Sequence, residues 1–473
     1  MASSKKSPRC DLRSHVAGVL AKVLKSNNPH LALGLSGGVD SMVLLDILQA
    51  LSKKLRFKLS AVHVNHQLSP NASSWARFCE RQCRACGVTL RMAKVKVSGA
   101  REIGLEAAAR QARYRVYCKQ PADYIVLAHH LDDQAETLLL QLLRGSDVKG
   151  SSAMPDIRIV DSGFETRKAG LCILRPLLNV PRSEIERYAK SRKLKWIEDE
   201  SNDNIRLDRN FLRHKVFPVI GKHFPAYRET LGRAGRHFAE AAQLLDELAG
   251  LDLRTSNRDG RLQVAALRKL TPARAKNLLR HYLAQNNVPV PGAKKLDEIL
   301  HQLTGARGDA RVSMVLGEWE VRRFKGEVYI CGVQRDAGEL CIRWRGEPCL
   351  SISELNGVMS FQRGKGKGIA YARLAAKLVT IRLRQGGEKL RPDGRRPRRS
   401  LKNLLQESAI APWERSRLPL LFSGRRLVFV PGIGIDSDYQ AKPGEPGLSV
   451  KWDVNYTGSS SNKVHKLKNN YGE

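Results

Sequence analysis

The sequence predicts an α/β protein that begins with a doubly wound parallel sheet and continues into a mostly helical region and a small α+β region. Three observations support this class. A strand, a tight turn and a helix follow one another at residues 31–45, strands and helices alternate up to about residue 128, and helical patterns dominate from about residue 225. Alternating strands and helices produce a parallel sheet covered by helices on both faces.

The turn at residues 36–41 reads SGGVDS and predicts an anion-binding loop. Two adjacent glycines allow a sharp turn, and the N-terminus of the next helix offers unpaired N–H groups and partial positive charge. The common NTPase loop places a lysine after its glycines. Here Asp40 occupies the turn, which makes sense beside a polyphosphate chiefly if magnesium lies between them. The predicted nucleotide-binding residues are Ser36, Gly37, Gly38, Val39, Asp40 and Ser41, with Asp40 as the metal ligand.

The rest of the N-terminal region follows the same alternation. Expected helices cover residues 14–26, 73–86 (closed by Gly87) and 104–117, and expected strands cover residues 56–66, 88–97 and 124–128. Ligands of parallel sheets bind at the carboxyl ends of the strands. This rule places residues 36–41, 63–66 and 129–136 along one rim, where we slightly favour a functional role for His63 and His66.

A second dense segment, residues 127–145, begins where a strand ends and continues as a helix. Its spacing places His129, Asp133 and Glu136 on one side, with Leu131, Leu138 and Leu142 opposite. An imidazole and two carboxylates at a sheet rim can hold a metal, orient an amine or move a proton. The pattern does not decide whether His129 or His130 faces the site.

A third segment, residues 199–215, combines a polar loop with clustered cations. Arg206, Arg209, Arg213 and Lys215 follow the turn formers at residues 201–204. Arginines on such a loop can clamp the phosphates of ATP or RNA.

Composition indicates a polyanionic partner and a reducing compartment. The chain has 82 Lys and Arg against 46 Asp and Glu, a formal net charge of +36, which exceeds what solubility requires. Its cysteine count is odd, at 9, and we expect a cytoplasmic protein without membrane-spanning segments. Cys79, Cys83 and Cys86 could suggest zinc, an iron–sulfur cluster or a redox thiol, but their spacing also suits buried apolar positions, which we favour.

We divide the chain into five parts from these patterns. A nucleotide-binding catalytic domain is predicted at residues 1–222, a helical RNA-binding domain at 223–335, a linker at 336–377, an α+β RNA-binding domain at 378–455, and a basic flexible tail at 456–473. Trp413 could stack on a base. The cations expected to contact RNA are Arg274, Arg280, Arg391, Arg395, Arg396, Arg398, Arg399 and Lys402.

These motifs together resemble the tRNA(Ile)-lysidine synthetases, members of the PP-loop ATP pyrophosphatases. The resemblance rests on SGGVDS at 36–41, GLEAAARQARY at 104–114, AHHLDDQAETLLLQLLRG at 128–145, RPLL at 175–178 and DESNDNIRLDRNFLRHKVFP at 199–218. It continues through residues 270–283 and 384–395.

The resemblance implies ATP-dependent ligation of free L-lysine to the wobble cytidine of an isoleucine tRNA with a CAU anticodon. An adenylated cytidine is the implied intermediate, and ATP and magnesium are the implied cofactors. The implied catalytic residues are Asp40, His129, Asp133, Glu136, Arg209 and Arg213. A homodimer is a possible assembly.

Other functions remain open at this stage. A PP-loop tRNA thiolase would need reactive cysteines at the nucleotide site. A non-catalytic RNA-binding protein would keep the fold but cleave no ATP. A small-molecule ligase would leave the charge of +36 unexplained.

Overall fold

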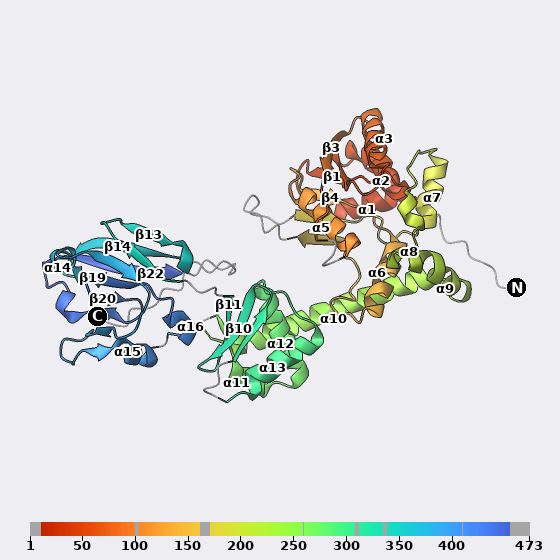
Figure 1. Ribbon diagram of the computed structural model, residues 1–473. Coiled ribbons are helices and arrows are strands. Elements are labelled where there is room, and N and C mark those ends of the chain that lie inside the picture. Colours follow the sequence, from red (N-terminus) through yellow and green to blue (C-terminus); the bar gives the residue numbers. More distant parts are fainter. Residues whose placement is uncertain are drawn as a thin grey trace. The chain divides into compact units, whose positions relative to one another are not determined.

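The computed structural model describes residues 11–99, 104–160, 171–258, 260–307, 312–333, 338–408 and 410–454. It separates into two compact units, Met1–Leu244 and Leu245–Glu473 (Figure 1). The tail predicted at residues 456–473 lies outside the described residues.

The first unit is built on a six-stranded sheet with the order β3-β2-β1-β4-β6-β5. All neighbours pair in parallel except β5, which runs antiparallel to β6 at the edge. The strands are β1 (His30–Gly34), β2 (Lys58–Asn65), β3 (Thr89–Lys94), β4 (Tyr124–Val126), β5 (Ile157–Val160) and β6 (Leu171–Leu174).

Helices cover both faces of this sheet, which confirms the predicted doubly wound class. Leu31 and Leu33 of β1 pack into one apolar cluster and Ala32 into another, since successive strand residues point to opposite faces. The helices are α1 (Leu12–Val23), α2 (Val39–Ser52), α3 (Ala72–Ala85), α5 (Leu105–Cys118), α6 (Leu131–Leu143) and α7 (Arg182–Ser191). Elements β5, β6 and α7 were not anticipated, because their apolar runs are short.

A chain of short helices follows α7 and leads into one long helix. The long helix is α10 (Tyr227–Ser256). It is preceded by a 3-10 turn (Glu200–Asp203), α8 (Asp208–Phe211), a π-helical segment (Leu212–Val216) and α9 (Phe217–His223). Small residues let α10 lie close to the segment around Ala153, because a Cβ at Gly235 would lie only 2.8 Å from the Cβ of Ala153.

The first part of the second unit joins three helices to a five-stranded sheet. The helical pattern predicted from about residue 225 is confirmed here by α11 (Val264–Lys269), α12 (Pro272–Gln285) and α13 (Ala293–Gly305). The sheet order is β7-β8-β11-β10-β9. Its strands are β7 (Asn257–Arg258), β8 (Arg261–Gln263), β9 (Val312–Leu316), β10 (Trp319–Phe324) and β11 (Glu327–Gly332).

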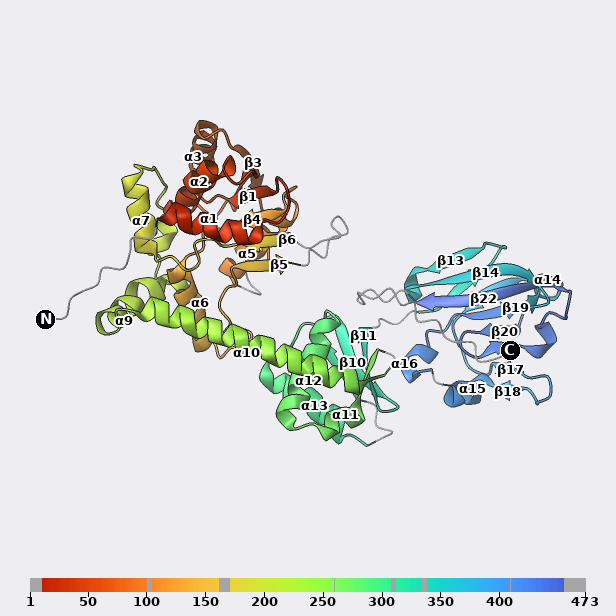
Figure 2. The same ribbon diagram turned by 180° about the vertical axis from the view of Figure 1, so that it is seen from behind.

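The last part of the chain forms two larger sheets and a hairpin (Figure 2). One sheet has the order β12-β16-β19-β20-β21 and the other β13-β14-β22-β15, while β17 and β18 pair alone. The strands are β12 (Cys341–Arg343), β13 (Cys349–Ile352), β14 (Gly357–Lys365), β15 (Ile369–Ala370), β16 (Val379–Arg382), β17 (Lys389–Leu390), β18 (Arg399–Ser400), β19 (Leu420–Ser423), β20 (Arg426–Val430), β21 (Gly434–Ile435) and β22 (Pro446–Val454). Its helices are α14 (Tyr371–Ala375), α15 (Leu401–Glu407) and α16 (Pro412–Arg415).

The predicted linker at residues 336–377 is wrong for the part that the structure describes. Strand β14 pairs with β22 along its whole length, and Met359 and Phe361 are buried in the same core as Trp452. Within this predicted linker, the stretch RGKGKG at residues 363–368 begins inside β14. Glycines and lysines at the end of this strand hid its apolar alternation.

Candidate active site

The loop at residues 36–41 connects β1 to α2, as predicted, and its own hydroxyls hold its shape. The N–H of Gly37 donates to Ser41 Oγ at 3.1 Å, and the N–H of Gly38 donates to Ser36 Oγ at 3.2 Å. Helix α2 begins after Gly38 without a side-chain cap, so side chains leave its first N–H groups free to donate to an anion.

Gly37 has a backbone angle φ of +93°, in the region that favours glycine. Its carbonyl accepts a hydrogen bond from the N–H of Ile197 at 2.9 Å. A Cβ at this position would lie 2.7 Å from Ile197 Cδ1 and 3.1 Å from Cys79 Sγ. The loop therefore rests on the chain segment after α7 and on α3.

The cysteines of α3 lie in the core, as the favoured interpretation predicted. Cys79 and Cys83 are buried, and burial raises the pKa of Cys79 to about 12 and that of Cys83 to about 11. Within the described ranges, no group of three or more His, Cys, Asp or Glu side chains has the geometry of a metal site.

Asp40 lies in the first turn of α2, opposite the N-terminus of α6. Its Oδ2 is 3.7 Å from His130 Nε2, while its Oδ1 is buried without a hydrogen-bond partner among the described residues. Burial raises the pKa of the Asp40 carboxyl. An orphaned, buried carboxylate oxygen beside an anion-binding loop fits a cation bound between carboxylate and phosphate.

The structure corrects the predicted start of the helix at the second segment. Helix α6 begins at Leu131 and His130 is its N-cap, so His129 lies before the helix and not on its face. His130 Nδ1 accepts from the N–H of Asp133, and Asp133 Oδ2 accepts from the N–H of His130 at 3.0 Å. Of the leucines predicted on the opposite side, Leu131 and Leu138 are buried and Leu142 is exposed.

Both histidines thus reach the site, each by a different route. His130 Nε2 lies 3.5 Å from Asp133 Oδ2. Burial would raise the pKa of Asp133, but His130, His129 and the N–H of His130 together hold it below its ordinary value. Asp133 is therefore an ionised carboxylate in a partly buried position.

His129 accepts a hydrogen bond from a buried arginine. Arg175 Nε donates to His129 Nδ1 at 3.2 Å, and Arg175 Nη1 donates to the carbonyl of Pro155 at 2.7 Å. Burial lowers the pKa of His129 to about 3. The nearby Asp133 carboxylate raises this pKa, whereas the positive charges of Arg175, Arg110 and Arg209 lower it further. His129 is therefore a neutral imidazole whose proton is on Nε2.

Glu136 meets the arginines of the third segment, which the sequence predicted to turn toward a phosphate site. Arg213 Nε and Nη2 donate to the two oxygens of Glu136 at 2.7 and 3.0 Å. Arg209 Nε lies 3.9 Å from Glu136 Oε2, and Arg209 Nη2 donates to Thr137 Oγ1 at 3.1 Å. Burial raises the pKa of Glu136 although Arg213 acts against this. Arg213 is also 3.9 Å from Asp133.

Two rim histidines and one further acid complete the surroundings. His63 Nδ1 lies 2.9 Å from the carbonyl oxygen of Leu35, and burial lowers the pKa of His66 to about 4. Asp132 accepts from the N–H of Arg182 at 2.9 Å and pairs with Arg228, which ties α6 to α7 and α10. Sequence reasoning missed Arg175 and Asp132, although both stand inside motifs that carried the resemblance.

The cations predicted to contact RNA divide into paired and exposed groups. Arg274 pairs with Asp252, Arg399 with Glu407, and Arg391 and Arg398 with Asp438. Arg280 is half-buried on α12, while Arg395, Arg396 and Lys402 are exposed. The Trp413 ring makes T-shaped contacts with Phe324 and Tyr329, and Arg322 lies over the ring at 4.9 Å from its centre.

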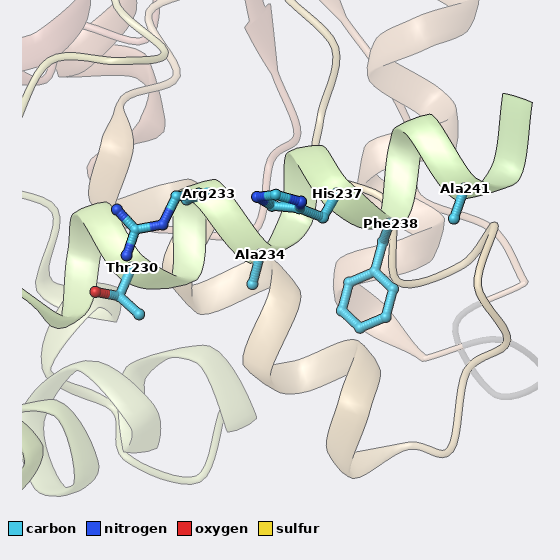
Figure 3. Close-up of a pocket in the computed structure, with 6 residues that line it drawn as sticks. All are labelled: Thr230, Arg233, Ala234, His237, Phe238 and Ala241. Carbon is cyan, nitrogen blue, oxygen red and sulfur yellow. The ribbon is translucent and has the colours of Figure 1, made fainter.

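A groove of about 520 Å³ runs along one face of α10 (Figure 3). The predicted catalytic and nucleotide-binding residues do not line it. It is formed by Thr230, Arg233, Ala234, His237, Phe238 and Ala241. No described helix is both long enough and apolar enough to span a membrane.

Family models match three parts of the chain. A PP-loop domain matches residues 12–220, a TilS substrate binding domain matches residues 262–329, and a TilS substrate C-terminal domain matches residues 379–452.

Similar proteins span most of the chain. The tRNA(Ile)-lysidine synthase of Nitrosomonas europaea is 46% identical over 89% of this chain and 91% of that protein. The tRNA(Ile)-lysidine synthase of Coxiella burnetii is 35% identical over 90% of this chain and 94% of that protein. Among solved structures, the U34-tRNA thiolase of Methanococcus maripaludis aligns with a TM-score of 0.40 and 20% identity, over 48% of this chain and 78% of that chain.

We predict that Gly37→Ala destabilises the fold and removes ATP binding, whereas Gly38→Ala leaves the fold intact. A methyl group at Gly37 would combine an unfavourable φ with a close contact, at a cost of about 2 kcal/mol or more. At Gly38 a Cβ would meet its nearest atom, Ser36 Oγ, at 3.5 Å. Urea unfolding and calorimetric ATP titration measure both effects. Equal stability of the two variants would contradict the packing described for Gly37.

We also predict that His129 makes stability fall in acid. Its folded pKa of about 3 lies below the ordinary 6.5, so its contribution is fully present above pH 6.5 and is lost as pH falls toward 3. Between pH 6.5 and 5 the loss is about 2 kcal/mol, at about 1.4 kcal/mol per pH unit. Urea unfolding at pH 7 and pH 5 should show this loss in the wild type and not in His129→Gln. The same pH dependence in both proteins would mean that His129 titrates normally.

Proposed function

This chain belongs to the tRNA(Ile)-lysidine synthase family, and we propose how its residues divide the reaction among themselves. The protein is an enzyme that forms lysidine on isoleucine tRNA at the expense of ATP. The observation that carries the proposal is the convergence of Asp40, Asp133, Glu136 and Arg213 beside the loop at residues 36–41.

The loop at residues 36–41 would bind the leaving pyrophosphate. The first N–H groups of α2 and the hydroxyls of Ser36 and Ser41 provide donors, and Asp40 would hold a magnesium ion through its unpartnered Oδ1. When bound there, magnesium would neutralise phosphate charge and make pyrophosphate a better leaving group. Arg209 and Arg213 would add positive charge where negative charge develops.

Adenylation would come first. The O2 oxygen of the wobble cytosine attacks the α-phosphorus of ATP, a P–O bond forms, and the bond between the α-phosphorus and the bridging oxygen breaks to release pyrophosphate. This step is needed because a carbonyl-type oxygen is a poor leaving group. The adenylate then leaves as AMP when the ε-amine of lysine bonds to ring carbon 2.

Lysine must lose a proton before its amine can attack. Asp133 and Glu136 would bind its ammonium group and accept that proton, since the buried Glu136 and the partly buried Asp133 both lie beside Arg213 at the site. The structure revises the part played by His129: its Nδ1 is occupied by Arg175, so it would orient neighbours by donating from Nε2 and would not act as the base.

We propose the remaining assignments on similar grounds. Residues 1–222 would carry the chemistry, and residues 223–335 and 378–455 would bind tRNA through the exposed cations among those predicted. Eight described cysteines are free thiols, which suits a cytoplasmic protein. A thiolase would need an accessible, acidic thiol, whereas burial raises the pKa of Cys79 and Cys83. Whether the enzyme is a homodimer stays a prediction.

The proposal predicts ATP-dependent transfer of labelled lysine into isoleucine tRNA bearing a CAU anticodon. Asp40→Asn should lower this transfer at least about 100-fold, because the carboxylate charge that would hold magnesium is lost. Its matched control is Asp46→Asn, on the same helix but paired with Arg13. Release of pyrophosphate only with a sulfur donor, or tRNA binding without ATP cleavage, would overturn the proposal.

A further inference from the structure

The hairpin β17–β18 carries a basic stretch at its tip, residues 391–398, with four arginines and one aspartate. Only two residue pairs, Lys389 with Ser400 and Leu390 with Arg399, join the strands. A hairpin this short is not stable by itself in water. Contacts outside the hairpin must therefore hold the tip in its conformation.

Asp436 supplies the central contact from a fully buried position. Its side chain has 0% exposure, and its two oxygens accept from Arg398 Nη1 at 2.6 Å and Nη2 at 3.1 Å. It also accepts from the backbone N–H of Arg391 at 3.2 Å. One buried carboxylate thus binds both ends of the tip.

The 3-10 turn after Asp436 extends this support. Asp438 pairs with Arg391, Arg398 and Arg426. Arg391 Nε donates to Ser437 Oγ at 2.9 Å, and the N–H of Ser437 donates to the carbonyl of Arg391 at 2.7 Å. Arg391, Arg398 and Arg426 thus form ion pairs with Asp436 or Asp438, and the first two belong to the tip.

The outer residues of the tip are arranged differently. Arg395 and Arg396 are exposed. Arg396 contacts Asp393 at 3.6 Å with 73% of its side chain exposed, and such a surface pair contributes little. No ion pair of the Arg395 side chain is present among the described residues. The tip thus presents two neighbouring guanidinium groups on a backbone that Asp436 and Asp438 hold in place.

We propose that this tip is a preorganised phosphate clamp for the tRNA backbone, in which Arg395 and Arg396 contact phosphates and Asp436 and Arg398 are positioning residues. The inference rests on the proposed function, because it takes tRNA as the partner. Guanidinium groups match phosphate oxygens in geometry, and a fixed backbone reduces the entropy lost on binding.

The direction in which one substitution changes tRNA affinity distinguishes a positioning role of Asp436 from a purely electrostatic effect. Asp436→Asn removes a negative charge near the bound polyanion, so electrostatics alone predicts tighter tRNA binding. If Asp436 positions the tip, the same substitution weakens binding although the net charge becomes more positive.

The test measures the Kd of the full-length protein for isoleucine tRNA across a series of salt concentrations. Arg395→Gln/Arg396→Gln should raise Kd about tenfold or more and reduce the slope of log Kd against log salt by about 1.5, the value for two lost phosphate contacts. Its control is Arg343→Gln/Arg345→Gln, which removes the same charge from two exposed arginines of the same unit. The control should change Kd by less than about twofold.

Asp436→Asn should raise Kd about fivefold and flatten the salt slope, because the two phosphate contacts lose their fixed geometry. Arg398→Lys keeps the charge but loses the two-pronged bond, so it should behave similarly, and it provides the test should Asp436→Asn fail to fold. An unchanged or lower Kd in folded Asp436→Asn or Arg398→Lys, or equal Kd values for the two double variants, would overturn the clamp. Lysine transfer by the wild type is measured alongside, since its absence would instead refute the proposed function.

Discussion

The buried ion pair between Glu136 and Arg213 is the contact on which the candidate site depends. It joins α6, which leaves the sheet rim, to the π-helical segment after α8, far along the chain. Glu136 is 2% exposed, whereas the Arg213 side chain is 25% exposed, so removal of Arg213 would leave a buried carboxylate with only Arg209 at 3.9 Å, at a cost of up to about 3–5 kcal/mol. The pair therefore holds Arg213 at 3.9 Å from Asp133, and His130 links Asp133 to Asp40 of the loop at residues 36–41.

The arrangement also explains why neighbouring ionisable groups behave differently. His129 and His130 are adjacent in sequence, yet one accepts from Arg175 and the other caps α6 beside Asp40. Asp132 and Asp133 differ in the same way, because one anchors α7 and α10 while the other faces the site. These roles follow from the start of α6 at Leu131, which makes His130 the N-cap and leaves His129 outside the helix.

The sequence predicted the parallel sheet, most helices of both units and the residues that converge at the site, because each lies in a motif with a clear period or turn. It did not predict that His129 precedes α6, since a capping histidine and a helical histidine have the same spacing. Arg175 escaped notice because a buried arginine without a carboxylate partner has no sequence signal. The strands at residues 341–370 were missed because β22, the partner of β14, lies far along the chain.

Net charge proved a poor guide to which cations are available to RNA. Several arginines predicted as RNA contacts are paired with Asp252, Glu407, Asp436 or Asp438. Charge density along the sequence therefore identified the basic regions, while the carboxylates that organise them came from distant segments and could be recognised only in the folded chain.

The most direct test of the account is a double-mutant cycle of Glu136→Ala and Arg213→Ala on lysine transfer to tRNA. If the two residues act as one unit, each single variant loses most of kcat/KM and the double variant is no worse than the poorer single one. Losses that multiply in the double variant would show that the residues act independently and would contradict the account.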